Sequence, residues 1–70
     1  MYLKVNEKYE TDFGFIVPRS HMTESFGQRY CIVQVITGGH EHFTSRHTTM
    51  TTKEISKLLH LKARERIYLV

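Results

Sequence analysis

The five histidines and the single cysteine are the residues of this 70-residue chain best suited to bind a metal or act as a nucleophile. His40 and His42 are two residues apart, so on a strand both imidazoles share one face, which suits zinc. Two ligands do not make a site, and His47 is expected on the opposite face. Cys31 is expected about four residues, or ~13 Å, along the strand from His42. We therefore predict no metal and no cofactor; a third ligand for His40 and His42 would have to come from elsewhere in the chain or from a second subunit.

Catalytic chemistry is not indicated by the remaining polar residues. Cys31 lies between apolar neighbours in a β-branched run, where a cysteine usually acts as a small hydrophobic residue. The seven acidic residues are scattered along the sequence, and Glu54 is assigned to a helix cap. No glycine-rich phosphate loop follows a predicted strand. The chain is therefore expected not to be an enzyme.

Positive charge is concentrated in the C-terminal half. The formal net charge is +3, and residues 1–35 carry equal numbers of basic and acidic side chains. Five of the six basic residues in the second half are Lys53, Lys57, Lys62, Arg64 and Arg66. Two interpretations stay open: the solvated face of a helix, which is the commoner one, or a surface that contacts nucleic acid.

A β-hairpin is the strongest local prediction. Residues 30–36 are rich in β-branched side chains, and Gly38 and Gly39 offer the positive φ of a tight turn. A two-residue turn predicts that Val33 pairs with Thr44 and that Val35 pairs with His42. The face assigned to the core is the one that carries the larger apolar side chains: Tyr30, Ile32, Ile36 and Phe43.

A helix over residues 52–61 is predicted from two start signals. Thr51 and Glu54 have the spacing of a capping box, and Met50 can pack against Ile55 as a hydrophobic staple. Ile55, Leu58 and Leu59 then form an apolar stripe expected to face a sheet. Residues 66–70 regain strand character. The predicted fold is α+β: a small antiparallel sheet, made of a hairpin over 29–47 and a C-terminal strand over 66–70, packed by one helix.

The N-terminal 21 residues are expected to form a strand-like extension to a domain over residues 22–70. Residues 17–22 also resemble the protease-site remnant of an expression vector with one glycine missing, so a native and a vector-derived origin both stay open. The N-terminus holds no long apolar run, and the lone cysteine does not favour an oxidising compartment. These features predict a cytoplasmic protein without a membrane span.

The layout from Met22 onward resembles the small phage-encoded inhibitors of uracil-DNA glycosylase. The resemblance covers about two thirds of the chain and rests on Tyr30-x-Ile32-x-x-Val35, Gly39, Phe43, His47, Met50-Thr51-x-x-Glu54-Ile55-x-x-Leu58 and Ile67-x-Leu69. It implies a compact sheet-plus-helix dimer that mimics DNA and binds an apolar finger of the enzyme.

Two functions are therefore carried forward. The first is a non-enzymatic, phage-type or mobile-element-type protein, expected to be a homodimer, that inhibits or modulates a host nucleic-acid-processing protein. Its expected contact residues are Phe43, Ile55, Leu59 and Tyr68, because a short sheet and one helix leave apolar area to be covered. The alternative is a nucleic-acid-binding accessory protein that uses Lys53, Lys57, Lys62, Arg64 and Arg66.

Overall fold

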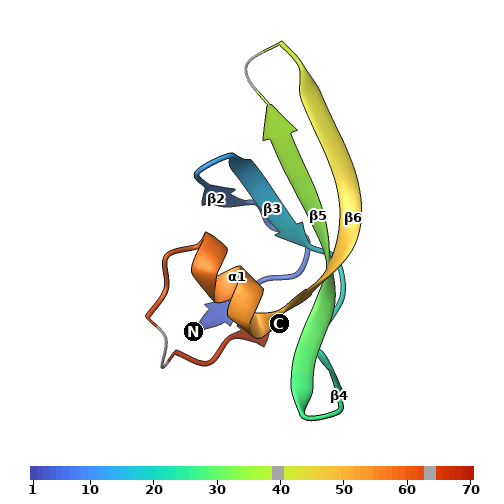
Figure 1. The fold of residues 1–70 in the computed structure, drawn as a ribbon, viewed down its shortest axis with the longest axis vertical. Helices are drawn as coiled ribbons and strands as arrows, with labels where there is room; N and C mark the ends of the chain where they lie inside the picture. Colours follow the sequence, from blue (N-terminus) through green and yellow to red (C-terminus); the bar gives the residue numbers. More distant parts are fainter. Residues whose placement is uncertain (39–40, 63–64) are drawn as a thin grey trace.

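Strands make up most of the regular structure in a computed structural model that describes residues 1–38, 41–62 and 65–70. Along the chain the elements are β1 (Tyr2–Leu3), β2 (Tyr9–Thr11), β3 (Gly14–Pro18), β4 (Thr23–Ser25), β5 (Gln28–Gly38), β6 (Phe43–Thr51), α1 (Thr52–Leu58) and β7 (Tyr68–Leu69). The fold is broadly α+β, as predicted, but its sheet is larger and more curled than one hairpin and one added strand (Figure 1).

The long strand β5 organises a five-stranded antiparallel sheet. On one side it pairs with β6 over nine residues, and on the other it pairs with β3 and then β4. The short strand β2 extends the sheet beyond β3. Figure 1 shows β5 and β6 bending together along the molecule, with α1 lying in front of them.

The predicted register of the β5–β6 hairpin was wrong. β5 ends at Gly38 and β6 begins at Phe43, and these two residues are paired. Val33 therefore pairs with Thr48 and not with Thr44, and Val35 pairs with Arg46 and not with His42. The register moves by four residues because the connection is longer than a two-residue turn. An even shift leaves the side chains of each strand on their original faces.

The predicted core face of the hairpin was also wrong. Cys31, Val33 and Val35 are buried, whereas Ile32 and Phe43, on the opposite face, are 47% and 65% exposed. Both faces of β5 carry apolar side chains, so the alternation along this strand did not distinguish them. The neighbouring elements determine which face of β5 is buried. β3 places the buried Ile16 opposite Val35, and α1 covers the same face.

The helix begins as predicted and ends early. Thr51 and Glu54 form the full capping box, and the stripe packs against the sheet, with Ile55 completely buried and Leu58 and Leu59 partly buried. The helix ends at Leu58, because His60 adopts a left-handed φ of 55° that stops helical hydrogen bonding. No helix in the described parts of the chain has the length and apolar character needed to cross a membrane.

The C-terminal strand lies outside the antiparallel sheet, which corrects the predicted topology. β7 pairs in parallel with β1, and the amide of Tyr68 donates to the carbonyl oxygen of Met1 at 2.9 Å. Residues 1–21, expected to be an extension, form β1, β2 and β3. They supply Leu3 and Ile16 to the core, where Ile67 from the C-terminus joins them.

Candidate nucleic-acid interface

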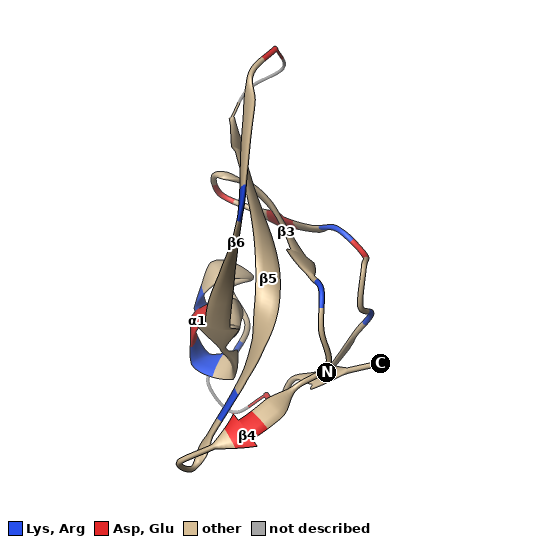
Figure 2. Cartoon of the chain, turned by 90° about the vertical axis from the view of Figure 1, so that its right-hand side faces the viewer, with Lys and Arg blue, Asp and Glu red and all other residues tan. Residues whose placement is uncertain are grey.

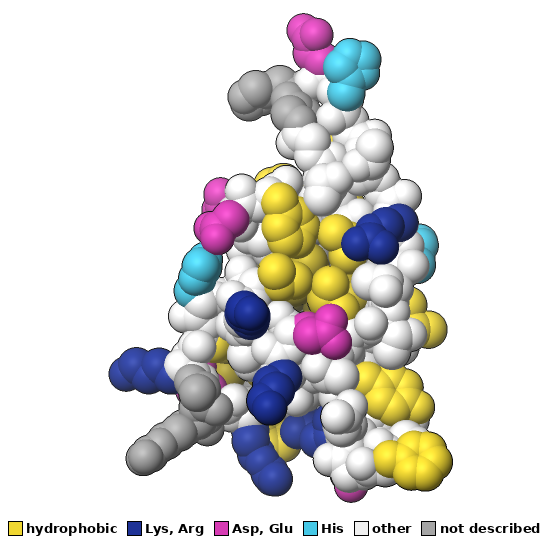
Figure 3. All heavy atoms as spheres, viewed as in Figure 1, with side chains coloured by type: hydrophobic (Ala, Val, Ile, Leu, Met, Phe, Trp, Pro, Cys, Tyr) yellow, Lys and Arg dark blue, Asp and Glu magenta, His cyan; other side chains and the backbone are white. Residues whose placement is uncertain are grey.

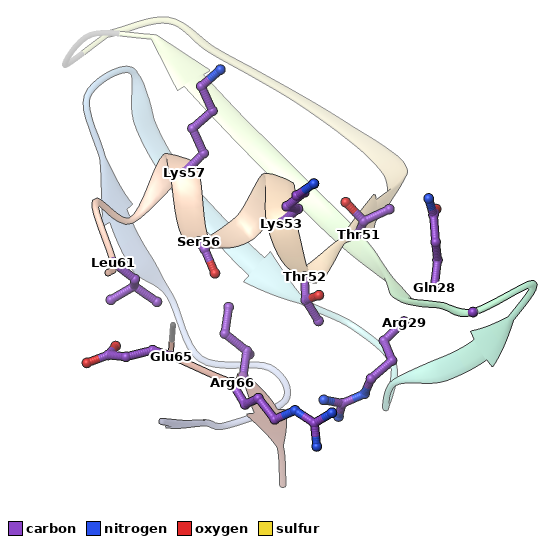
Figure 4. Close-up of a pocket in the computed structure, with 12 residues that line it drawn as sticks. Gln28, Arg29, Thr51, Thr52, Lys53, Ser56, Lys57, Leu61, Glu65 and Arg66 are labelled. Carbon is purple, nitrogen blue, oxygen red and sulfur yellow. The ribbon is translucent and has the colours of Figure 1, made fainter. Parts of the chain in front are cut away.

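A groove of about 780 Å³ opens between α1, the start of β5 and the segment that leads into β7. We call this the basic groove. Figure 4 shows side chains from all three segments around it. The residues that line it are Gly27, Gln28, Arg29, Thr51, Thr52, Lys53, Ser56, Lys57, Leu61, Glu65, Arg66 and Ile67.

The capping box positions one wall of the basic groove. It fixes the first turn of α1, so that Lys53 and Lys57, one helical turn apart, both lie along the groove. Thr52 and Ser56 lie on the same wall, and in Figure 4 the Ser56 hydroxyl points into the space between the helix and residues 65–67. The helix therefore contributes hydroxyl donors and two lysines to the lining, although the Lys57 side chain extends away from Arg66 in Figure 4.

The opposite wall contributes two guanidinium groups. Arg29 comes from the start of β5 and Arg66 from the segment before β7, and their side chains extend toward one another in Figure 4. Glu65 is the single acidic residue among the lining residues. Within residues 1–38, 41–62 and 65–70 the one basic–acidic side-chain contact within ion-pair distance joins His60 to Asp12, and it involves none of these cations. Four basic side chains thus surround the groove without acidic partners in ion-pair contact.

An aromatic cluster adjoins Arg29. The rings of Tyr2 and Tyr68 are stacked with their centroids 5.4 Å apart, and the Arg29 guanidinium lies 5.1 Å from the centroid of Tyr68. Tyr2 is 72% exposed, so one ring of the stack is open to solvent. Parallel pairing of β1 with β7 places Tyr2 opposite Tyr68 and so forms the stack from the two ends of the chain.

Phe26 is fully exposed at the turn between β4 and β5, directly before the groove-lining Gly27. Ser25 pairs with Gln28, so Phe26 and Gly27 form a two-residue turn, with φ values of 51° and 76°. Such a turn favours Asn-Gly, and a bulky residue at a positive φ is unusual there. Neither burial nor turn preference explains a phenylalanine at position 26. Its presence there indicates a role for the ring at the surface.

The structure brings together three of the five predicted nucleic-acid residues. Lys53, Lys57 and Arg66 line the basic groove, whereas Lys62 is exposed and does not line it, and Arg64 lies outside the described residues. Arg29 was not predicted. It belongs to the half of the sequence whose charges balance, so its role emerges only when β5 is placed beside α1.

The four predicted partner-binding residues do not form one surface. Ile55 is completely buried, and Leu59 is partly buried against the core. Phe43 is exposed at the start of β6, and Tyr68 lies in the aromatic cluster near the opposite end of the strand pair. Ile32 is also exposed on the outer sheet face, but it pairs with Thr49, six positions along β6 from Phe43.

Two described residues that were considered as a metal ligand or a nucleophile, His42 and Cys31, lie apart, one exposed and the other in the core. His42 is exposed near the start of β6, and His40 lies outside the described residues. Among the residues that are described, no three His, Cys, Asp or Glu side chains are grouped as metal ligands would be. Burial raises the pKa of the Cys31 thiol, which lies within the core, as expected for a small hydrophobic residue in a sheet.

Basic and hydrophobic side chains gather on different parts of the face shown in Figure 3. In Figure 3 the Lys and Arg side chains gather over α1 and the lower part of that face, and hydrophobic side chains gather above them, beside the helix. On the face shown in Figure 3, most of the basic side chains therefore lie over α1 and below it, although basic residues that do not line the groove, such as Arg46 and Lys62, are also exposed.

Comparison with known proteins adds no family to these observations. No protein-family model matches the chain, and neither the curated proteins nor the solved structures give a match. The resemblance to uracil-DNA glycosylase inhibitors stays a prediction from the sequence.

Proposed function

We propose that this protein binds single-stranded nucleic acid in the basic groove. One observation carries the proposal: Arg29, Lys53, Lys57 and Arg66, from three separate segments of the chain, line one groove with a single acidic residue among them. A groove lined by clustered cations is the usual means of following a phosphate backbone.

The groove also offers groups that position phosphates. Hydroxyl groups such as those of Thr52 and Ser56 donate hydrogen bonds to phosphate oxygens, and arginine does so with a planar, two-pronged geometry. A strand bound here therefore gains both charge neutralisation and directed hydrogen bonds.

The aromatic side chains favour a single strand over a duplex. Tyr2, at the open side of the stack, and Phe26, at the hairpin turn, present faces on which unpaired bases can stack. Reading a duplex usually requires a helix or ribbon that enters the major groove. The seven-residue α1, about 10 Å long, instead packs against the sheet through Ile55.

A salt series on a charge-matched pair of variants tests this proposal. We expect a labelled oligonucleotide of about 12 nucleotides to raise its fluorescence anisotropy on binding, with affinity falling steeply between about 50 and 200 mM salt. Lys53→Gln with Lys57→Gln should weaken binding by about tenfold or more at low salt, and should reduce the slope of log K against log salt by about 1.4.

The control removes the same charge elsewhere. Lys4→Gln with Lys8→Gln alters two lysines that do not line the groove, and Lys8 lies instead over the ring of Phe15. This double variant should keep nearly the full affinity and salt slope. Equal losses in the two double variants, or no binding by the unaltered protein at low salt, would contradict the proposal.

A second candidate function is binding to a host protein, in the manner of a phage-type inhibitor. The observation that favours it is the outer sheet face, where Ile32 and Phe43 are exposed with the half-buried Phe15 and Ile36 on the same side. Such a contact would be apolar and would tolerate added salt, whereas binding in the basic groove would not. The salt dependence of any complex therefore assigns it to one surface.

A further inference from the structure

The outer edge of β6 is open along its length. β6 is nine residues long and, within residues 1–38, 41–62 and 65–70, pairs with β5 alone and on one side. Figure 2, which views the molecule from the β6 side, shows no element lying over this strand. Phe43–His47 and Thr49 are exposed, in agreement with the picture.

The hydrogen bonds of β5 identify which main-chain groups of β6 face outward. The amide of Ile32 donates to the Ser20 hydroxyl at 2.9 Å, and its carbonyl accepts from Arg19 at 2.8 Å, so even-numbered residues of β5 point away from β6. The odd-numbered residues therefore bond to β6, opposite its even-numbered residues. Ser45, His47 and Thr49 consequently direct both their amide and their carbonyl groups outward.

This edge lacks several of the features that normally block strand addition, and Arg46 is its one Lys or Arg residue. It contains no proline and no lysine, and its register with β5 is continuous from Phe43 to Thr51 without a bulge. Four of its nine residues are threonine, which suits a strand, and one is serine. An open edge of this kind is a template for another strand.

We propose that β6 pairs antiparallel with β6 of a second copy of this chain, about a twofold axis through His47. This register places Ser45 opposite the second copy's Thr49 and His47 opposite its counterpart. Because all three residues direct their main-chain groups outward, the pairing makes about six hydrogen bonds across the axis.

Charge disfavours one of the two neighbouring registers. If the axis passed through Arg46, the two Arg46 side chains would lie directly opposite one another, which destabilises an antiparallel pair. With the axis through His47, Arg46 lies opposite Thr48 of the second copy. A second copy is therefore the occupant that matches this edge in both main-chain pattern and charge.

The pairing of two β6 strands does not depend on the basic groove, but it would determine how the two grooves of a dimer are arranged. A twofold axis perpendicular to the sheet keeps α1 of both copies on the same face, so the dimer would present two basic grooves on one side. Each groove lies near Thr51, at the C-terminal end of β6, four residues from His47.

Sedimentation equilibrium on the whole chain tests the association. Between about 10 µM and 1 mM protein, the weight-average mass should rise from the 8.3 kDa of one chain toward twice that value. A mass that stays at one chain throughout this range would overturn the proposal.

A charge exchange at position 47 tests the register. His47→Lys and His47→Glu should each weaken self-association at least about tenfold, because like charges then lie opposite one another, and an equimolar mixture should recover the dimer. Thr11→Lys, on the outer strand β2, is the matched control and should associate like the unaltered protein. Association of the two position-47 variants at unaltered strength would also overturn the proposal.

Amide hydrogen exchange supplies a readout that does not rely on variants. The amides of Ser45, His47 and Thr49 should exchange at least about tenfold more slowly at high protein concentration, whereas those of Arg46 and Thr48, already bonded to β5, should change little. Unchanged exchange at the three odd-numbered positions would place any dimer contact elsewhere. The double variant Lys53→Gln with Lys57→Gln should retain the dimer, so failure of the nucleic-acid proposal and failure of this one are distinguishable.

Discussion

Burial of Cys31 makes the stability of the folded state depend on pH. Its side chain is 2% exposed within the core, and burial raises the pKa of its thiol. The folded state therefore holds this proton more tightly than the unfolded chain does. The stabilising effect is fully present below the unfolded pKa, about 8.5, and is lost as the pH rises from there toward the folded pKa.

We expect the free energy of unfolding to fall more steeply above about pH 8.5 in the unaltered protein than in Cys31→Ala. The difference between their pH profiles isolates the thiol, because lysine and tyrosine titrations are common to both. Urea unfolding at several pH values measures it. Parallel profiles from about pH 7 to pH 10 would show that the thiol does not contribute. Cys31→Ala should also lower stability at neutral pH, since it removes a buried sulfur atom.

Phe26, in the turn of the β4–β5 hairpin, bears on both the stability of the fold and the proposed binding of oligonucleotides. Phe26 occupies a turn position with φ of 51°, where asparagine followed by glycine is favoured, and its ring is fully exposed. Replacement by asparagine removes a ring that stabilises nothing in the free protein and improves the turn.

Phe26→Asn should therefore leave the melting temperature unchanged or raise it by a few degrees, while weakening oligonucleotide binding by about tenfold, the effect of one lost base stack. Thermal unfolding and fluorescence anisotropy on the same preparation measure the two effects. A fall in stability would mean that the ring packs against the protein. Unchanged affinity would remove Phe26 from the binding surface.

At the scale of the whole molecule, the two ends of the chain are held together. β1 pairs with β7, and the core combines Leu3 and Ile16 with Ile55 and Ile67. Residues 1–21 also contribute β3, which pairs with β5 on the side opposite β6. The remaining 49 residues would lack one sheet neighbour and part of the core.

A chain limited to residues 22–70 is therefore expected not to form a stable fold. Loss of Leu3 and Ile16 alone removes two buried side chains, each worth about 2–5 kcal/mol, which is comparable to the total stability of a small domain. Circular dichroism should show no cooperative thermal transition for this fragment. A cooperative transition like that of the whole chain would instead mark residues 1–21 as dispensable for folding.

Local sequence determined the elements whose signals are self-contained. The Thr51–Glu54 capping box sets the helix start, and the apolar stripe of Ile55, Leu58 and Leu59 sets its buried side, because both depend on residues within two helical turns. The β-branched run over residues 30–36 likewise predicted a strand, and it lies within β5.

Tertiary structure decided the features that depend on distant segments. Both faces of β5 carry apolar side chains, so the core face was settled by β3 and α1, which cover Cys31, Val33 and Val35. The register of β6 depended on the length of the connection after Gly38. The basic groove arose in the same way: Arg29 and Arg66 are 37 positions apart, and only the folding of β5 and the C-terminal segment around α1 makes their charges act together. Charge and apolar pattern are properties of a segment, whereas a site is a property of the contacts between segments.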